Sequence, residues 1–128
     1  LEISKNNSKI EKIGKVSLQI LDIENTFPGF GFYPKPGKCV GMLHDFVKEQ
    51  KKIDSLVTIG IMSTAITIRA TDEANFSVHD LIKHLNKNLP NAFVEGGGHK
   101  NAGSITFLPN IQEKVILSLK EFIKLHNR

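Results

Sequence analysis

Two short aliphatic runs, separated by a polar turn, constrain the fold of this chain more than any other feature. The runs are SLVTIGIM (55–62) and AITIRAT (65–71), and only Ser63 and Thr64 lie between them. Because β-branched residues favour strands, the sequence predicts two neighbouring strands here. Polar and apolar side chains alternate in the second run, so Arg69 is expected on the polar face of a strand.

The rest of the chain alternates between strand and helix patterns. Strands are predicted over 16–23 and 104–108, with a bulge allowed at Leu21, where the alternation slips. Apolar residues at helical spacing predict three helices, which cover 39–52, 78–89 and the segment after Asn110. The fold class is therefore α/β: a single compact domain with a mixed β-sheet packed by about three helices.

Two helices begin with capping patterns. Ser77 is followed three residues later by Asp80, and Asn110 is followed by Glu113 at the same spacing. A short polar side chain before an apolar stripe, with an acidic residue three positions on, is typical of a helix N-terminus. The sequence therefore predicts Ser77 and Asn110 as N-caps.

Composition places the chain among globular proteins. Of its 128 residues, 40% are hydrophobic and 23% are charged, and no run is long enough for a membrane span. Neither a signal peptide nor a disulfide is expected, because the chain has no charged-then-apolar leader and one cysteine, Cys39, predicted to be a buried apolar residue. A cytoplasmic location without a membrane partner is therefore expected.

A net charge of +4 permits anionic partners such as nucleotides or nucleic acid, although the lysines are scattered. The segment that could bind them is EGGGHKNAGS (95–104). It fits neither the dinucleotide fingerprint, because Asn101 stands at the sixth position, nor the P-loop, because Ser104 follows its last glycine.

Two interpretations of this glycine segment remain open. Glycines can bring backbone N–H groups close to an anion, His99 can bind a phosphate, and residues 99–102 could form a helical turn that favours an anion. Alternatively, the segment is a plain turn between a helix and a strand with an exposed His99, because glycine supplies unusual backbone angles in both cases.

The segment GGGHKNAGS resembles the signature of the DHH-associated domain, the C-terminal substrate-binding domain of DHH phosphoesterases. The order of the flanking elements agrees, because ITIRAT precedes the helix 78–89 and the glycine segment follows it. The resemblance covers roughly residues 16–126. Its family includes RecJ-type single-strand exonucleases, nano-RNA oligoribonucleases that also act on pAp, and cyclic-dinucleotide phosphodiesterases.

The resemblance implies which residues bind substrate. The phosphate and nucleotide backbone would contact Gly96, Gly97, Gly98 and His99. Arg69 would hold a terminal phosphate, for which a planar guanidinium is suited. The family usually has Ser after this arginine, but this chain has Ala70, so a hydroxyl ligand is expected to be absent. The choice among nano-RNA, single-stranded DNA, pAp and cyclic dinucleotides stays open.

The family's catalytic residues are expected outside this sequence. Its members hydrolyse phosphodiesters with two divalent metals, commonly Mn²⁺, held in an N-terminal domain. This chain has no Asp-His-His triplet, and the pairs His44–Asp45 and His79–Asp80 are interpreted as solvated helix faces. No catalytic or metal-binding residue is therefore assigned, and the chain alone is expected to be inactive. Residues 1–15 are expected to be a linker to that domain, and residues 16–128 the substrate-binding domain.

Several alternatives remain at this point. The aromatic loop FPGFGFYPKPGK (27–38) could stack nucleic-acid bases, but packing into the core or against the catalytic domain is favoured. The whole domain could bind short oligonucleotides or nucleotides for hydrolysis, sense a nucleotide without hydrolysis, or dock a protein partner. The sequence does not indicate an oligomeric state.

Overall fold

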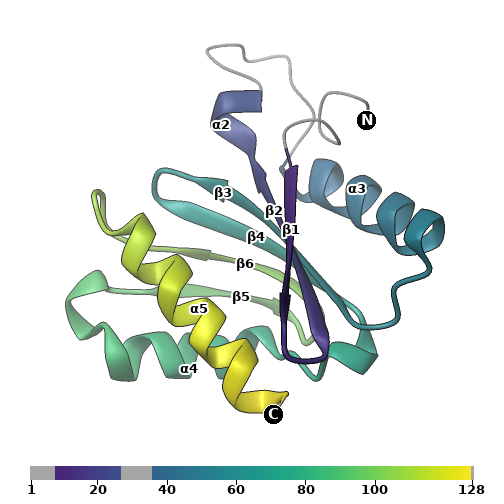
Figure 1. Cartoon of the computed structure of the whole chain (residues 1–128). Helices are drawn as coiled ribbons and strands as arrows, with labels where there is room; N and C mark the ends of the chain where they lie inside the picture. Colours follow the sequence, from purple (N-terminus) through teal and green to yellow (C-terminus); the bar gives the residue numbers. More distant parts are fainter. Residues whose placement is uncertain (1–7, 27–35, 128) are drawn as a thin grey trace.

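A six-stranded mixed sheet forms the centre of the molecule (Figure 1). The structure is a computed structural model that describes residues 8–26 and 36–127. The strands are β1 (Ser8–Ile13), β2 (Val16–Asp22), β3 (Leu56–Met62), β4 (Ala65–Ala70), β5 (Glu95–His99) and β6 (Ala102–Thr106). They lie in the order β1-β2-β3-β4-β6-β5; β2 and β3 are parallel, and all other neighbours are antiparallel.

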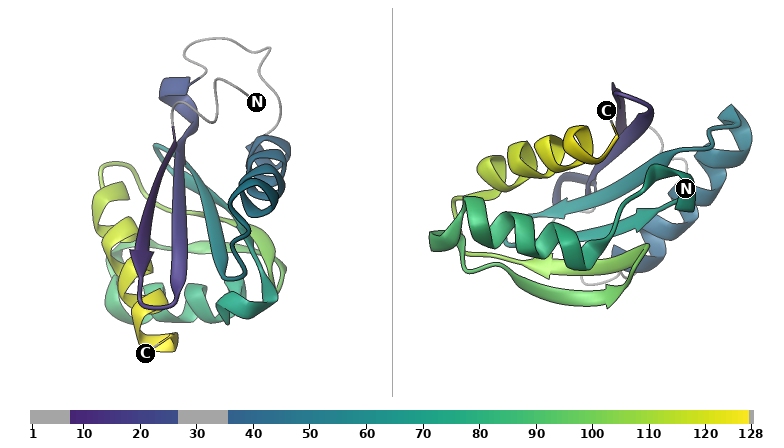
Figure 2. Two further views of the ribbon diagram at one scale, coloured as in Figure 1. Left: turned by 45° about the vertical axis from the view of Figure 1, so that its right-hand side comes forward. Right: turned by 90° about the horizontal axis from the view of Figure 1, so that it is seen from below.

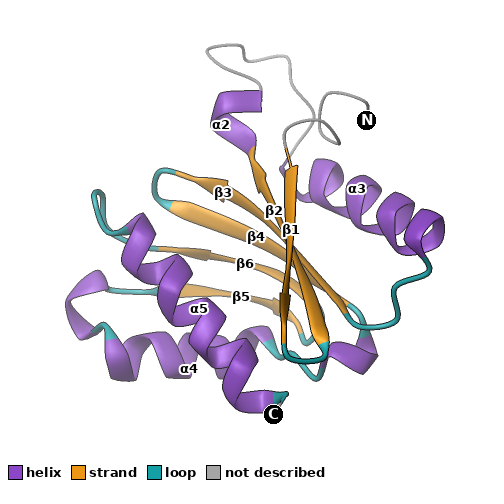
Figure 3. Cartoon of the chain, in the orientation of Figure 1, coloured by secondary structure: helices purple, strands orange, loops and turns teal. Residues whose placement is uncertain are grey.

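Helices cover the two faces of the sheet unequally. The helices are α2 (Ile23–Thr26), α3 (Pro36–Lys51), α4 (Val78–Asn88) and α5 (Gln112–His126), with short 3₁₀ turns at η1 (Asp72–Ala74) and η2 (Pro90–Ala92). Figure 2 shows α3 on one side of the sheet and α4 and α5 on the other. Helix α3 packs on β3 and β4, whereas α4 packs along β5 and β6 (Figure 3). Among the helices of the described residues, none packs on the α3 side of β5 and β6.

Each face of the sheet has its own apolar core. The larger core fills the space under α4 and α5, where Leu81 and Phe122 meet sheet residues such as Ile68 and Ile105. The smaller core lies under α3 and includes Val40 and Leu43. These buried positions follow the helical and strand periodicities of the sequence, which explains why an α/β fold could be predicted.

Most predicted elements are confirmed, including the turn at Ser63–Thr64 and the N-cap Ser77, whose Oγ accepts a hydrogen bond from the Asp80 backbone N–H at 3.3 Å. The N-cap at Asn110 is wrong. Helix α5 starts at Gln112 after Ile111, with no side-chain capping bond, and Asn110 has φ 66°, a left-handed turn conformation that asparagine tolerates. The bulge at Leu21 is also wrong, because β2 keeps continuous register with both neighbours.

The segment expected to be a linker contributes a strand. Residues 8–13 pair with β2 as the edge strand β1, and Glu11 Oε1 lies 2.7 Å from Lys120 Nζ of α5. The linker prediction is therefore wrong for these residues: their polar sequence reflects an exposed edge strand. Most of the aromatic loop, residues 27–35, lies outside the described residues.

The helices that the described residues form do not include one with the length and apolar character needed to cross a membrane.

Candidate functional site

Four residues of four neighbouring strands form a row across one face of the sheet. Arg69 of β4 pairs with Thr58 of β3 and with Ala102 of β6, and Ala102 in turn pairs with His99 of β5. Paired residues point to the same face of a sheet, so Arg69 and His99 lie on one face with Ala102 between them. Their backbones are two inter-strand spacings apart, about 10 Å.

The outer part of this row is open to solvent. Arg69 and His99 are exposed and Ala102 is partly exposed, while the opposite face of β4 and β6 is buried in the core under α4 and α5. The prediction that Arg69 lies on the polar face of a strand is thus confirmed. Within residues 8–26 and 36–127, its guanidinium pairs with no carboxylate, so its charge is available to an anion.

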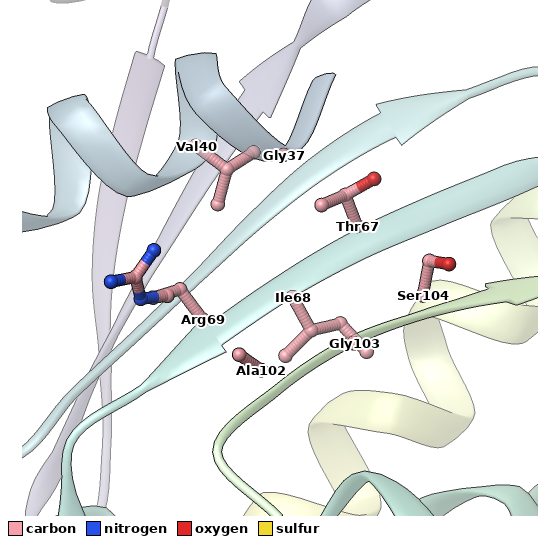
Figure 4. A pocket seen from close by; sticks show the side chains of 8 residues that line it. All are labelled: Gly37, Val40, Thr67, Ile68, Arg69, Ala102, Gly103 and Ser104. Atoms are coloured by element: carbon pink, nitrogen blue, oxygen red, sulfur yellow. The ribbon is translucent and has the colours of Figure 1, made fainter. Parts of the chain in front are cut away.

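A cavity of about 440 Å³ lies on this open face, between α3 and the strands β4 and β6 (Figure 4). Its lining residues are Gly37, Val40, Thr67, Ile68, Arg69, Ala102, Gly103 and Ser104. In Figure 4 the Arg69 guanidinium lies at one end, and the hydroxyls of Thr67 and Ser104 lie toward the other. Among the described lining residues, Arg69 alone is charged. The cavity therefore combines one cationic end with one neutral, hydrogen-bonding end.

Two glycines of α3 allow the helix to approach the site closely. A Cβ added to Gly41 would lie 2.6 Å from Nη1 of Arg69, and a Cβ on Gly37, one turn earlier, would lie 4.0 Å from Cγ2 of Thr67. The guanidinium therefore occupies the space that a side chain at position 41 would fill. This fixes one wall of the cavity against β4.

The three consecutive glycines form strand β5, not a loop, and they serve two different purposes. Gly96 and Gly98 have φ of 153° and 133°, and a Cβ added to either would collide with a backbone carbonyl oxygen of β6. No other residue fits there without strain, so strand packing accounts for both. Gly97 differs, because a Cβ there would meet nothing within 4 Å. It lies opposite Ser104, on the open face.

The helical turn expected at residues 99–102 is not formed. His99 ends β5, Lys100 and Asn101 make a tight turn, and Ala102 begins β6. The turn is held by the Lys100 carbonyl, which accepts from the Val78 N–H at 3.0 Å, and by the Asn101 carbonyl, which accepts from the Ala70 N–H at 2.8 Å. The Asn101 side chain also donates to Asp72. These two residues of the signature therefore anchor the β5–β6 turn.

Position 70 lies on the opposite face from the site. Ala70 is buried, 6% exposed, in the core under α4 and α5. A serine hydroxyl there would point into that core, so alanine at this position removes no group from the open face. Two hydroxyls line the cavity on the open face, those of Thr67 and Ser104, which are paired directly across β4 and β6.

A buried polar network continues the row beneath α3. His44 is 4% exposed, and its Nδ1 lies 2.7 Å from Thr58 Oγ1, whose hydroxyl donates to Gln19 Oε1 at 3.2 Å. Since the Thr58 proton is directed to Gln19, His44 Nδ1–H donates to Thr58. The pKa of His44 is lowered to about 4, chiefly by burial; the charge of Asp45 opposes this shift, and the positive charges of Arg69 and Lys48 contribute to it.

The sequence interpretation of His44 as part of a solvated face is therefore wrong. The spacing of apolar residues could have predicted its burial, since His44 lies four residues after Val40 and three before Val47, on the buried stripe of α3.

The other pair, His79 and Asp80, is exposed on α4, as predicted. Among the described residues, no three His, Cys, Asp or Glu side chains gather in a group that could hold a metal. Cys39 is buried, as predicted, and burial raises the pKa of its thiol.

Comparison with known proteins gives matches to parts of longer chains and to one separate domain. No protein-family model matches the chain. An uncharacterised protein of Methanocaldococcus jannaschii is 33% identical over 114 residues, which are 85% of this chain and 15% of that protein. The chain therefore spans a small part of the length of this curated relative.

A solved structure described as the DHH domain of a member of a ribosomal protein family is more informative. It is 31% identical, with a TM-score of 0.90 over all of this chain and 30% of the matched one. The likeness therefore extends to sequence as well as fold.

Two other structures share the fold at lower identity. The pGpG-specific phosphodiesterase of Vibrio cholerae has a TM-score of 0.59 at 12% identity, over 98% of this chain and 37% of that one. The C-Ala domain of Aquifex aeolicus alanyl-tRNA synthetase has a TM-score of 0.54 at 18% identity, over 91% of this chain and 98% of that one. Together with the DHH-domain structure, these likenesses confirm that the chain resembles the DHH-associated domain, as its glycine signature and arginine strand indicated.

Proposed function

We propose that the chain is the substrate-binding domain of a DHH-family, metal-dependent phosphoesterase that acts on short oligonucleotides or small nucleotides. The observation that carries the proposal is the row of Arg69, Ala102 and His99 on an uncovered sheet face, beside Gly97. A guanidinium, an imidazole and an uncovered backbone are each groups that can bind phosphate.

Each residue has a distinct role in this proposal. The guanidinium of Arg69 donates two parallel hydrogen bonds to phosphate oxygens, and Gly41 gives it the space to lie against α3. His99 donates from the far side of Ala102, so that the phosphate lies over the small alanine side chain. Gly97 lets the substrate approach the backbone of β5, while Gly96 and Gly98 shape that strand.

The bond-breaking groups would belong to a DHH domain of the same protein, where divalent metals, Mn²⁺ by the family resemblance, would activate water. The residues described in this chain would contribute binding and orientation of the substrate. The open face of β4, β6 and β5 would then look toward that domain, and the substrate would lie between the two.

Binding tests the proposal directly. Amide NMR spectra of the chain would be recorded during titration with pAp, a short 5′-phosphorylated oligonucleotide and a cyclic dinucleotide. The signals of Gly97 and Ala102 are expected to shift and saturate with at least one of them. Arg69→Gln should weaken that binding about 10-fold to 100-fold, because charge-assisted hydrogen bonds contribute about 1.5–3 kcal/mol.

A matched control is available in His79, which is exposed on α4, away from the cavity. His99→Ala should weaken binding, while His79→Ala should leave it unchanged. Hydrolysis is measured separately, with the complete protein and Mn²⁺. Absence of binding to the chain, together with unaltered kinetics of the Arg69 and His99 variants of the complete protein, would disprove the proposal.

A further inference from the structure

The neutral end of the cavity differs chemically from its cationic end. Thr67 of β4 and Ser104 of β6 are a directly opposed pair, two residues along the strands from Arg69 and Ala102. That offset corresponds to about 6.8 Å along the sheet. The two hydroxyls are therefore beyond the first phosphate held at Arg69, but within the length of a single nucleotide.

The orientation of both hydroxyls suits a ligand. The methyl carbon of Thr67 faces Gly37 of α3, and Figure 4 shows the Thr67 hydroxyl on the other side of Cβ. Ser104 is exposed and Thr67 partly so. Gly97, paired with Ser104 on the next strand, has no side chain to cover them.

The chemistry of this pair selects a sugar over a second phosphate. Arg69 alone among the described lining residues is charged, so no described residue that lines the Thr67–Ser104 end would neutralise a second anion. A threonine and a serine hydroxyl each donate and accept hydrogen bonds, as do the hydroxyls of ribose. An alcohol pair beside a single cation thus fits one phosphate and its attached sugar.

We infer that Thr67 and Ser104 recognise the ribose hydroxyls of a nucleotide whose phosphate is bound at Arg69, so that the domain prefers ribonucleotides to deoxyribonucleotides. This inference rests on the proposed phosphate site. It adds a specificity-determining pair on the open face of the sheet.

The probes are adenosine 5′-monophosphate and its 2′,3′-dideoxy analogue, titrated into the chain by NMR or calorimetry. The wild-type chain should bind the ribonucleotide about fivefold more tightly, the value of one net hydrogen bond. The double variant T67V/S104A should lose this preference while keeping its affinity for the dideoxy analogue. Thr106→Val is the control, because Thr106 is exposed on β6 on the same face but does not line the cavity.

Failure of this inference can be told apart from failure of the proposed function. Equal binding of both nucleotides by the wild-type chain, or a preference that survives in T67V/S104A, would overturn the ribose assignment while Arg69→Gln still weakened both nucleotides. The phosphate site and the ribose subsite both fall if Arg69→Gln binds both nucleotides as tightly as wild type. They also fall if neither nucleotide binds and the Arg69 and His99 variants of the complete protein keep unaltered kinetics.

Discussion

The Nη1 atom of Arg69 lies 2.6 Å from the point that a Cβ on Gly41 would occupy. Strand β4 and helix α3 therefore meet at a place where the helix has no side chain and the strand has a long charged one. The position of the cation depends on this absence. Glycine at position 41 thus serves the site, although it weakens the helix in which it lies.

Replacing Gly41 with alanine should lower nucleotide affinity without lowering the stability of the fold. The new methyl group would displace the flexible guanidinium of Arg69, whereas alanine is favoured over glycine inside a helix by about 1 kcal/mol. The free energy of unfolding should therefore stay equal or rise, while nucleotide affinity falls severalfold. Met42→Ala is the control, because Met42 is exposed on the same helix and does not line the cavity. Equal affinity of Gly41→Ala and Met42→Ala would contradict the prediction.

The glycines of β5 should respond unequally to substitution. Gly96→Ala places a Cβ against the Ser104 carbonyl oxygen at φ 153°, so we expect a loss of about 2 kcal/mol or more in the free energy of unfolding. Gly97→Ala meets no atom within 4 Å and should change stability by less than about 0.5 kcal/mol. Urea unfolding of the two variants measures the difference.

The two variants also distinguish a glycine required by the fold from a glycine required for nucleotide binding. Gly97→Ala points its methyl group at the open face, so nucleotide affinity should fall although the fold is intact. Similar destabilisation by both substitutions would mean that the strand, and not the ligand, requires all three glycines.

A larger side chain at position 102 should leave the stability of the fold almost unchanged but prevent nucleotide binding. It lies between Arg69 and His99 on a partly exposed face, so leucine there would fill the space proposed for the phosphate. We expect Ala102→Leu to lose nucleotide binding with little change in thermal midpoint. Thr106→Leu, exposed on the same strand and face, should bind normally. Retained binding by Ala102→Leu would place the phosphate elsewhere.

Much of this arrangement could be predicted from local sequence, because strand alternation and helical stripes are properties of neighbouring residues. They located β2 to β4, α3 and α4, and the exposed face of Arg69. Strand β5 was not predicted because glycine is unfavourable in strands, whereas β5 needs Gly96 and Gly98 for its close approach to β6. That approach depends on strand order, which brings β5 beside β6 at the sheet edge. Strand order cannot be predicted from the hydrophobic periodicity of the sequence.

The pairing of Thr67 with Ser104, and of Arg69 with Ala102, could not be predicted for the same reason. Register between strands separated by a helix is set by tertiary packing. His44 was misassigned through its neighbour: the exposed Asp45 suggested a polar face, yet the next position on a helix points elsewhere.

The burial of His44 predicts a specific dependence of stability on pH. Its pKa is about 4 in the folded chain against an ordinary value of 6.5, so the unfolded chain binds this proton more readily. The stabilisation is fully present above pH 6.5 and is lost as pH falls from 6.5 toward 4, by on the order of 3 kcal/mol. Below pH 4 both states are protonated, and this residue adds no further change.

Substitution by glutamine isolates this effect. In His44→Gln the side-chain amide can still donate to Thr58 but does not titrate, so the pH dependence between 6.5 and 4 should become shallower than in the wild-type chain. His79→Gln, at an exposed histidine of α4, should retain the wild-type slope. Urea unfolding at several pH values from 4 to 7.5 gives the slopes. An identical slope for His44→Gln and wild type would show that His44 is not kept neutral by the fold.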